Sequence, residues 1–474
     1  MSSRIILNAF DMACVTHQAP GLWRHPDNRA HTYTSIEYWT ELAQLLERGR
    51  FDALFLADVL GTYDVYRGSA AAALRDAAQV PLSDPLLAVS AMAAVTKNLG
   101  FGVTVALTYE QPYLLARRFS TLDHLTRGRI GWNVVTSYLE SAARNLGLKK
   151  QIAHDDRYAL GDEFLDVTYK LWEASWEDGA VIRDRERGIY TDPSRVHPIG
   201  HSGEFFDVPG IHLSEPSPQR TPVIFQAGAS PKGQEFAAKH GEAIFINGIR
   251  PELTRKTTDK IRDRAEALGR PRDSVKILTL VTVIVAETDA EAQRKHAEYR
   301  DYVSPEGALA LYGGWSGLDL SQYGEDEALA YVDTDAARSA LSIFTTADPD
   351  SRWTPADIAH YVGIGGIGPV IVGSPSTVAD ELERWVDVGG VDGFNLAYVV
   401  SPGSFEEFVE LVVPELRKRG RTWDDYEGST LRERLSGSPV VPEWHPAHRY
   451  RGSLVGGPTA DDTTLPAARI PAAL

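Results

Sequence analysis

Short apolar runs alternate with amphipathic stretches along most of this chain. Apolar runs of roughly four to eight residues, bounded by turn residues, are typical of buried strands. The run DALFLAD at 52–58 is a clear example. Runs of this kind predict strands at 4–11, 52–58, 101–107, 129–136, 222–228, 243–247, 275–285 and 393–399, with a shorter extended piece at 369–373.

Helical periodicity follows most of these strands. In 34–48 the apolar side chains recur at helical spacing, at Trp39, Leu42, Ala43 and Leu46. Thr34 and Glu37 have the spacing of a capping box, which predicts the start of this helix. Further helices are expected at 112–125, 158–172 and about 252–268, and after the caps Asp84, Thr288 and Ser374.

About eight strand–helix units alternate in this way, and no hairpin-rich region interrupts them. Such alternation predicts a parallel sheet flanked by helices. No GxGxxG motif follows the first strand, which favours a closed barrel over an open dinucleotide-binding sheet. The glycine cluster at 363–368 precedes an extended segment, so we interpret it as a loop. The sequence therefore predicts an α/β fold of the (β/α)8, or TIM, barrel type.

Several connections are too long for a minimal barrel. We expect the barrel to occupy residues 1–420, with long insertions near 60–83, 140–157, 176–220 and 302–368. Loops of such length usually carry function or small structures of their own. Residues 421–474 lack strong periodicity and are rich in Pro, Gly, Ser and Thr. They are expected to form an extended C-terminal arm or tail, with His445 and His448 at the surface.

Composition excludes several classes of partner. The chain has 474 residues, of which 65 are acidic and 48 basic, and its formal net charge is −17. A nucleic-acid partner is not expected, because phosphate backbones require a basic face. Cys14 is the only cysteine, so neither an intrachain disulfide nor a cysteine zinc site is expected. No apolar stretch reaches the length of a membrane span or signal peptide, and we expect a cytoplasmic protein without a metal.

Polar residues at strand ends are the first candidates for a site, because ligands of parallel barrels bind beyond the carboxyl ends of the strands. Asp58, Thr104 and Asn133 each lie at or near such an end. An N-cap or a salt bridge would also explain Asp58. Thr104 is a residue type that is common in strands without any function.

Two further segments predict an anion site. In QAGAS at 226–230, an apolar strand runs into small residues and then a helix, whose free N–H groups favour phosphate. A tight turn without a ligand is the alternative. In HDDRY at 154–158, His154 and Tyr158 share a face if the segment is helical, and both side chains can donate to a phosphate. The alternative is a capping segment, and a metal site is disfavoured because no second histidine has ligand spacing.

The loop after the first strand carries His17, Trp23 and His25 close to Cys14. An aromatic wall of this kind would suit an apolar substrate or a flavin ring. Ordinary packing explains the same residues equally well. We take His17, Trp23 and His25 as hypothetical residues of a substrate pocket.

Several long stretches resemble the bacterial luciferase-like flavin monooxygenases, within the group that includes nitrilotriacetate and dibenzothiophene sulfone monooxygenases. They include LNAFDMACVTHQAPGLWRHP, FDALFLADVLG, TLDHLTRGRIGWNVVTS, HDDRY, SPQRTPVIFQAGASPKG and GGVDGFNLAYVVSPGSFEEFVELVVPEL, and they cover residues 6 to about 435. DVLGTYDVYRGSAAAALRDAAQVPLSDP and PEGALALYGGWSGLDL resemble the members that oxidise dimethyl sulfide. The tail beyond about residue 437 has no counterpart in the resemblance.

The resemblance implies the FMN contacts. Asp58 and Thr104 would lie near the flavin ring, His154 and Tyr158 toward the ribityl and phosphate end, and Ser230 at the phosphate. Asn133 would also face the flavin.

The resemblance further implies the oxygenase subunit of a two-component enzyme, in which reduced FMN comes from a separate NAD(P)H-dependent flavin reductase. Reduced FMN and O2 would oxidise a small organosulfur compound, and dimethyl sulfide would yield methanethiol and formaldehyde. A sulfone or an aminopolycarboxylate is the alternative substrate, and a homo-oligomer, dimer or tetramer, is implied. A deazaflavin-dependent oxidoreductase on the same barrel and a non-catalytic flavin carrier also remain open. A barrel hydrolase is more distant, because no nucleophile motif is present.

Overall fold

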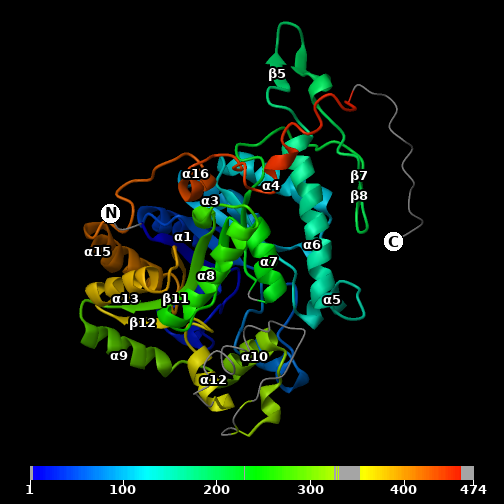
Figure 1. Ribbon diagram of the computed structural model, residues 1–474. Coiled ribbons are helices and arrows are strands. Elements are labelled where there is room, and N and C mark those ends of the chain that lie inside the picture. The colour runs from blue at the N-terminus through cyan, green and yellow to red at the C-terminus, as the bar shows by residue number, and fades with distance from the viewer. Residues whose placement is uncertain (1–3, 229, 325–326, 328, 330–352, 461–474) are drawn as a thin grey trace.

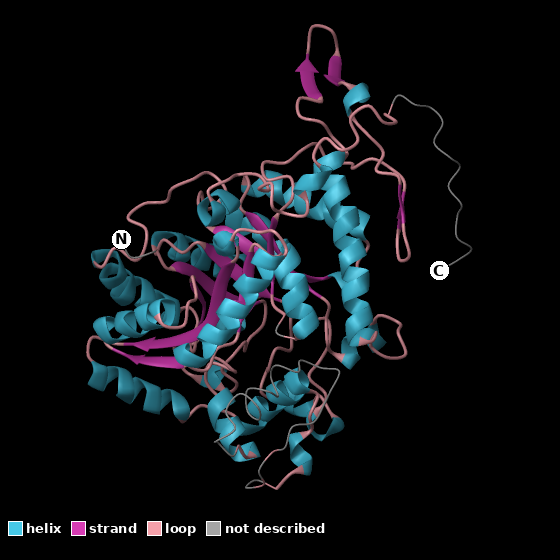
Figure 2. Ribbon diagram, viewed as in Figure 1, coloured by secondary structure: helices cyan, strands magenta, loops and turns pink. Residues whose placement is uncertain are grey.

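The computed structural model describes residues 4–228, 230–324, 327, 329 and 353–460. Within them, eight parallel strands close into a barrel, in the order β1-β2-β3-β4-β9-β10-β11-β13 and back to β1 (Figures 1 and 2). The strands are β1 Ile6–Met12, β2 Ala53–Ala57, β3 Gly100–Ala106, β4 Ile130–Val135, β9 Val223–Gln226, β10 Ala243–Ile246, β11 Lys276–Val285 and β13 Gly393–Ala397. The predicted barrel and its predicted strands are confirmed.

The extended piece expected at 369–373 is a strand outside the ring. β12 (Val370–Gly373) pairs with the second half of β11, beyond the point where the first half of β11 pairs with β10. Because β11 has 10 residues, it is long enough to pair with β10 along its first half and with β12 along its second half.

Helices cover the outside of the barrel. They are α1 Ile36–Arg48, α3 Pro85–Ala94, α4 Pro112–Thr126, α6 His154–Tyr169, α7 Pro231–His240, α8 Pro251–Ala267, α9 Asp289–Arg300, α13 Pro375–Asp387, α14 Gly403–Glu407 and α15 Val413–Lys418. The predicted caps Asp84, Thr288 and Ser374 each accept a hydrogen bond from a backbone N–H of the first turn.

Two predicted helix starts were wrong. The side chain of Ser35, not Thr34, caps α1 and accepts from the N–H of Tyr38, so the predicted capping box with Glu37 does not form. α6 begins at His154 and not at Tyr158, so the HDDRY segment is the first turn of the helix and not a loop. The helix continues beyond Tyr169 as a π-helical turn over Lys170–Ala174.

Aromatic side chains fill the centre of the barrel. Phe10, Phe55, Phe225 and Phe245 meet there, with ring centroids 5.2–5.8 Å apart. Glycine makes room for them, because a Cβ on Gly131 would lie 2.5 Å from the ring of Phe225. The interior is thus a packed core, and a ligand must bind at one end of it.

Two insertions build a smaller apolar cluster beside the barrel. It joins α2 (Ala71–Arg75), α10 (Pro305–Ser316) and α12 (Pro355–Val362) around the buried rings of Tyr63 and Trp315. α10 and α12 lie together below the barrel in the view of Figure 1. Residues 325–326, 328 and 330–352 of the 302–368 insertion lie outside the described residues.

The insertion expected at 176–220 contains two antiparallel hairpins, a feature that the sequence had not suggested. One pairs β5 (Val181–Asp184) with β6 (Ile189–Thr191), and the other pairs β7 (His201–Ser202) with β8 (Asp207–Val208). The β5–β6 hairpin projects away from the barrel (Figure 1). The β7–β8 hairpin lies beside α6, where the side chain of Glu163 accepts hydrogen bonds from the backbone N–H groups of Phe205 and Phe206. The insertion expected at 140–157 holds α5 (Glu140–Asn145) and the first turn of α6.

Residues 421–460 pack against the barrel, and residues 461–474 lie outside the described residues. α16 (Leu431–Ser436) brings Leu431 and Leu435 against Ile6 and Ala53, at the amino ends of the barrel strands. His445 is 1% exposed, so its predicted surface position was wrong. Its ring lies beside that of Tyr169 and hydrogen-bonds the carbonyl of His240.

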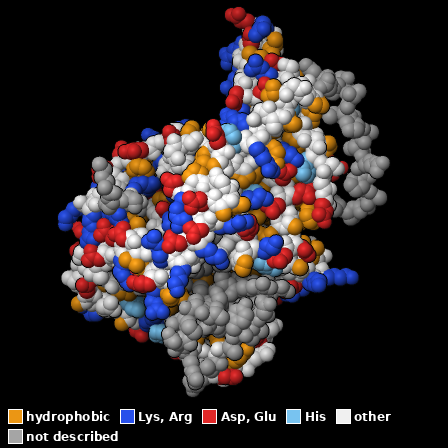
Figure 3. All heavy atoms as spheres, in the orientation of Figure 1, with side chains coloured by type: hydrophobic (Ala, Val, Ile, Leu, Met, Phe, Trp, Pro, Cys, Tyr) orange, Lys and Arg blue, Asp and Glu red, His pale blue; other side chains and the backbone are white. Residues whose placement is uncertain are grey.

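Acidic and basic side chains alternate over the face of the molecule shown in Figure 3. No helix in the described ranges combines the length and the apolar character that a membrane span needs. Those ranges also hold no cluster of three or more His, Cys, Asp or Glu side chains suited to a metal ion.

Candidate functional site

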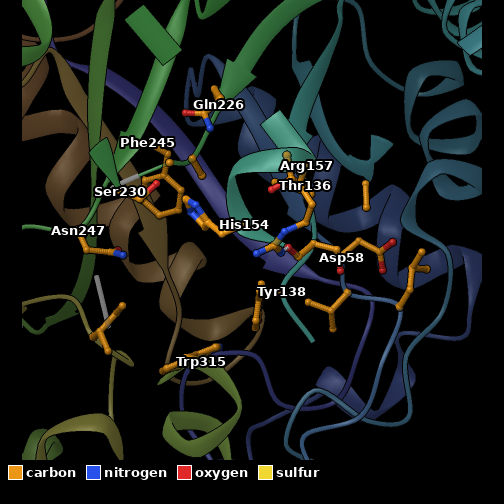
Figure 4. A pocket seen from close by; sticks show the side chains of 18 of the residues that line it. Asp58, Thr136, Tyr138, His154, Arg157, Gln226, Ser230, Phe245, Asn247 and Trp315 are labelled. Atoms are coloured by element: carbon orange, nitrogen blue, oxygen red, sulfur yellow. Dashed lines mark hydrogen bonds between the residues drawn. The ribbon is translucent and has the colours of Figure 1, made fainter. Parts of the chain in front are cut away.

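A cavity of about 300 Å³ opens at the carboxyl ends of the barrel strands. Phe10, Ala106, Val135 and Phe245, which lie near the carboxyl ends of their strands, form its floor. Loop and insertion residues form its walls (Figure 4). The walls include Gln18, Asp58, Val59, Leu60, Tyr138, His154, Arg157, Tyr158, Gln226, Gly228, Ser230, Asn247, Trp315 and Ile367.

One end of the cavity meets the N-terminus of α7. Ser230 caps this helix, and its hydroxyl accepts a hydrogen bond of 3.0 Å from the N–H of Gly233. The remaining N–H groups of the first turn carry the positive end of the helix dipole, which attracts a phosphate. Ala229, within the QAGAS segment, lies outside the described residues.

Two glycines keep the backbone open beside Ser230. A Cβ on Gly233 would lie 2.7 Å from the hydroxyl of Tyr158 and 3.0 Å from the Cα of Gly228. Gln226, at the end of β9, is 3% exposed, and its side-chain carbonyl has no hydrogen-bond partner. A ligand seated here would contact backbone directly and would supply a partner for a buried polar atom.

The first turn of α6 faces the same end. The ring centroids of His154 and Tyr158 lie 5.2 Å apart, so the two side chains do share a face. Burial raises the pKa of Tyr158, which therefore keeps its proton as a donor. Arg157, between them, donates to the main-chain carbonyl of Ser137. His154, Tyr158 and Ser230 thus converge from two helices, as Figure 4 shows for His154 and Ser230.

Asp58 follows β2 and lines the opposite wall. Burial, reinforced by repulsion from Asp84, raises the pKa of Asp58 to about 8. The carboxyl group is therefore largely protonated at neutral pH, and it can donate a hydrogen bond to a ligand.

Thr104 and Asn133 lie one layer deeper, two residues before the floor residues Ala106 and Val135 of the same strands. They are paired across β3 and β4, and the Asn133 side-chain N–H donates to the Thr104 hydroxyl at 2.8 Å. The Asn133 side-chain carbonyl is buried without a partner. These two residues do not line the cavity.

The three residues expected in a substrate pocket lie elsewhere. His17 is buried with its ring against Phe10, at a centroid distance of 4.4 Å, and burial lowers its pKa to about 3. His25 packs between Tyr299 and Tyr302. Trp23 is 39% exposed, because the loop after β1 turns outward at this point. None of the three lines the cavity, although the ring of His17 contacts Phe10, which does.

The second end of the cavity was largely missed by the sequence analysis. Its walls are mostly apolar and come from Val59, Leu60, Tyr138, Trp315 and Ile367, with the carboxamide of Gln18. These residues belong to different loops and insertions, so no local pattern groups them. The length of the 302–368 insertion was the one sequence feature that pointed to this end of the cavity, because long loops usually carry function.

The residues present fit FMN. One end offers a helix N-terminus, small residues and three side-chain donors for a phosphate. Aromatic and apolar side chains continue from there along the floor, as a flavin ring requires. The unpaired carbonyl oxygens of Gln226 and Asn133 are acceptors for ligand donors.

Comparison with known proteins agrees with this geometry. The model of the luciferase-like monooxygenase family matches residues 15–392. A dimethyl-sulfide monooxygenase of Hyphomicrobium sulfonivorans is 57% identical over 98% of this chain and 98% of its own length. The crystal structure of DmoA from the same organism has a TM-score of 0.92, at 56% identity over 98% of this chain and 99% of that one.

Other relatives carry different names. A long-chain alkane monooxygenase of Geobacillus thermodenitrificans is 53% identical over 95% of this chain and 99% of its own length. A riboflavin lyase, whose structure holds a modified FMN, has a TM-score of 0.89 at 38% identity over 95% of this chain and all of that one.

The group suggested by the sequence is confirmed. Dibenzothiophene-sulfone monooxygenase of Rhodococcus erythropolis is 38% identical over 90% of this chain and 95% of its own length, and nitrilotriacetate monooxygenase component A of Aminobacter aminovorans is 37% identical over 88% and 93%. These relatives favour oxygenation over the deazaflavin-dependent and non-catalytic alternatives. The chain belongs to the luciferase-like monooxygenase family and is a flavin-dependent monooxygenase of that family.

Proposed function

We propose that this chain is the oxygenase component of a two-component enzyme that uses reduced FMN and O2 to oxidise a small, uncharged organosulfur compound. With dimethyl sulfide, the products would be methanethiol and formaldehyde, with one oxygen atom leaving as water. The observation that carries the proposal is the cavity itself, which combines an anion-binding end with an apolar end.

FMN would lie along the cavity. Ser230, His154 and Tyr158 would hold its phosphate and ribityl chain, while Asp58 would lie near the ring, with Thr104 and Asn133 beneath it. When bound in reduced form, FMN supplies the electrons that activate O2. The neutral Asp58 carboxyl would donate to a ring acceptor, since its pKa is raised to about 8.

The chain's own residues bind, orient and exclude water. Trp315 and Ile367 bring the 302–368 insertion over the apolar end of the cavity, where they would shield the reacting atoms from solvent. His154 of the wall pairs with Asp155 at 2.9 Å, but the side chain of Asp155 is 66% exposed and does not line the cavity. We therefore assign the oxidative chemistry to the cofactor and not to this pair.

The substrate would be uncharged. Arg157 is the one Lys or Arg among the described wall residues, and it already donates to the carbonyl of Ser137. An aminopolycarboxylate would need several cationic partners. The dimethyl-sulfide relative supports an organosulfur substrate, and the alkane relative makes an alkane the main competitor.

Reduced FMN would come from a separate NAD(P)H-dependent reductase. The sequence offers no nicotinamide-binding fingerprint, and component A in the name of the nitrilotriacetate relative supports a divided system. We further propose a homo-oligomer, dimer or tetramer, and a barrel at 1–420 followed by a tail at 421–474.

The test is O2 consumption with product analysis by the pure protein, given NADH, FMN and a generic flavin reductase. The panel would contain dimethyl sulfide, longer dialkyl sulfides, a sulfone, nitrilotriacetate and a long-chain alkane. We expect substrate-dependent formaldehyde and thiol from dimethyl sulfide. Product from the alkane or the sulfone alone would identify that compound, and not dimethyl sulfide, as the substrate. Hydrogen peroxide alone from every compound would contradict the organosulfur proposal.

A further inference from the structure

Behind the apolar end of the cavity lies a buried hydrogen-bond network centred on Tyr63. The side chain of Tyr63 is 0% exposed, and its hydroxyl meets three polar groups. It lies 2.6 Å from the side-chain carbonyl of Gln79, 2.9 Å from the Tyr138 hydroxyl and 3.2 Å from the Trp315 indole nitrogen. Tyr138 and Trp315 are cavity walls, whereas Tyr63 and Gln79 are not.

The direction of each hydrogen bond in this network follows from Gln79. Its side-chain N–H donates to the main-chain carbonyl of His17 at 2.8 Å, so its carbonyl oxygen faces Tyr63. Tyr63 must therefore give its single proton to Gln79. The oxygen of Tyr63 then has only acceptor capacity left, and the indole N–H of Trp315 uses part of it. The hydroxyl of Tyr138 must consequently donate to Tyr63.

Tyr138 thus has no proton left for the cavity. Burial raises the pKa of Tyr138 to about 12, so the phenol remains protonated at neutral pH and its only proton stays on the bond to Tyr63. Toward a ligand, the Tyr138 oxygen can only accept. The neighbouring carboxamide of Gln18 carries both a donor and an acceptor, so it does not impose a preference of its own.

Packing holds this arrangement in place. A Cβ on Gly314 of α10 would lie 1.7 Å from the ring of Tyr63, so the helix backbone rests directly on that ring. The same helix carries Trp315. The insertion therefore cannot move away from Tyr63 without breaking both the ring contact and the indole hydrogen bond.

We propose that Tyr63, acting through Tyr138, makes the apolar end of the cavity selective for ligands that carry an O–H group over matched ligands that carry only C=O or S=O. This inference rests on the proposed function for its consequence in catalysis. Tyr63 is a positioning residue here, because it reaches the ligand only through Tyr138.

The consequence concerns the atom that is oxygenated. Insertion of one oxygen atom into a C–H bond of dimethyl sulfide gives a hydroxymethyl sulfide, whose O–H can donate to Tyr138. That product then releases formaldehyde when its C–S bond breaks and the hydroxyl proton passes to sulfur, which leaves as methanethiol. Oxygen transfer to sulfur would instead give a sulfoxide, whose oxygen only accepts and faces another acceptor. The network therefore favours oxidation at carbon.

Binding of 2-propanol and acetone tests the inference without turnover, because the two ligands match in size and differ in the donor. Ligand-observed NMR on the purified protein, with and without oxidised FMN, gives the two affinities. We expect 2-propanol to bind about threefold to tenfold more tightly, the range of one net hydrogen bond. In Tyr63→Phe the proton of Tyr138 is free to turn into the cavity, so the preference for 2-propanol should vanish or reverse.

Two further variants keep the test decisive if Tyr63→Phe does not fold. Gln79→Leu releases the proton of Tyr63 to Tyr138 and should also abolish the preference. Tyr138→Phe should abolish it by removing the acceptor. Tyr66→Phe is the matched control, because Tyr66 belongs to the same apolar cluster but its hydroxyl interacts with Arg67, outside the network, and it should keep the wild-type ratio.

An unchanged ratio in Tyr63→Phe and Gln79→Leu, or no binding of either ligand, would overturn the inference. If the enzyme oxidises dimethyl sulfide, the fraction of dimethyl sulfoxide should also rise in Tyr63→Phe and not in Tyr66→Phe. If no compound of the oxygenation panel is oxidised, the proposed function is wrong. The ratio of 2-propanol to acetone affinity would still test the direction of the hydrogen bonds around Tyr63.

Discussion

Ser230 both caps α7 and faces the cavity, so its removal affects a helix and a ligand site together. His154 approaches the same point from α6. We predict that Ser230→Ala combined with His154→Ala weakens FMN affinity by about tenfold or more, because two donors to the phosphate end are lost. Quenching of flavin fluorescence on titration would measure it.

A matched control separates the ligand effect from the loss of a helix cap. Thr288→Ala removes the equivalent cap of α9, and Thr288 does not line the cavity. Both cap variants should lose about 1 kcal/mol of stability. Only the Ser230 and His154 variant should lose flavin affinity, and unchanged affinity in a folded double variant would contradict the phosphate-site assignment.

Asp58 should make stability depend on pH. An unfolded aspartate has a pKa near 4, whereas that of Asp58 is raised to about 8 by burial. The folded protein therefore binds more protons between these values, and the contribution of Asp58 to the free energy of unfolding falls as pH rises from about 4 to about 8. Asp58→Asn should remove this loss, which is about 5 kcal/mol for four pKa units. In a chain of this length the Tm should then lie about 5 °C above the wild type at pH 9 and equal it near pH 4.

Thermal unfolding of the flavin-free protein across pH 4 to 9 would measure the effect. Asp424→Asn is the control, since the side chain of Asp424 is 92% exposed. It should leave the pH profile unchanged. A profile for Asp58→Asn that runs parallel to the wild type at every pH would show that the Asp58 carboxyl is ionised in the folded protein.

At this scale the sequence identified one end of the cavity and missed the other. Asp58, His154, Tyr158 and Ser230 were accessible because each follows a strand or opens a helix, and the barrel rule collects such positions. Trp315 could not be found in this way, because an insertion folds back over the barrel to deliver it. The roles of Asp58, His154, Tyr158 and Ser230 as flavin contacts remain predictions.

Among the elements, long periodic segments were predicted best. The apolar face of α1 and the strand β2 occur within two residues of their expected positions. The start of α6 was missed because HDDRY is polar throughout, and polar residues in a first turn are indistinguishable from a loop by periodicity. The hairpin strands of 176–220 have two to four residues each, which is too short for an alternating pattern to show.

The element that closes the amino end of the barrel is α16. Burial alone would raise the pKa of Glu242, but the charge and hydrogen bonds of Arg432 hold it below its usual value. Arg432 is 0% exposed and contacts Glu242 at 2.7 Å. It also donates to the main-chain carbonyls of Gln219 and Thr221. The α16 part of the tail is thus attached by a buried ion pair and two leucines, and contacts such as that of His445 with the carbonyl of His240 attach the rest.

Arg432→Ala should destabilise the protein by about 3–5 kcal/mol, because Glu242 is left buried without a partner. Arg432→Met combined with Glu242→Leu should recover most of this loss, since no unpaired charge remains. Thermal unfolding would compare them, with the exposed Arg449→Ala as control. Equal losses in the single and double variants would mean that the contacts of α16, and not the ion pair, attach the tail.

For the molecule as a whole, α3 is the helix on which we expect the interface of the proposed homo-oligomer. Its sequence, PLLAVSAMAA, carries no charge, and one face packs on the barrel through Leu86, Val89 and Met92. The opposite face leaves Leu87 77% exposed, together with Ser90 and Ala94. An uncharged helix that is apolar on both sides is typical of a buried position, so the outer face of α3 is the surface we expect a second copy to cover.

Leu87→Glu should therefore split the proposed homo-oligomer into smaller species, because an interface on α3 would bury an unpaired carboxylate in each copy. Size-exclusion chromatography with light scattering would give the mass of each species. Leu268→Glu is the control, since Leu268 is also exposed but ends α8 and should leave the mass unchanged. A wild-type mass equal to one chain would contradict the oligomer itself, and an unchanged oligomer in Leu87→Glu would assign the interface to another face. A smaller species that keeps its FMN affinity would show that each barrel builds a complete flavin site from its own residues.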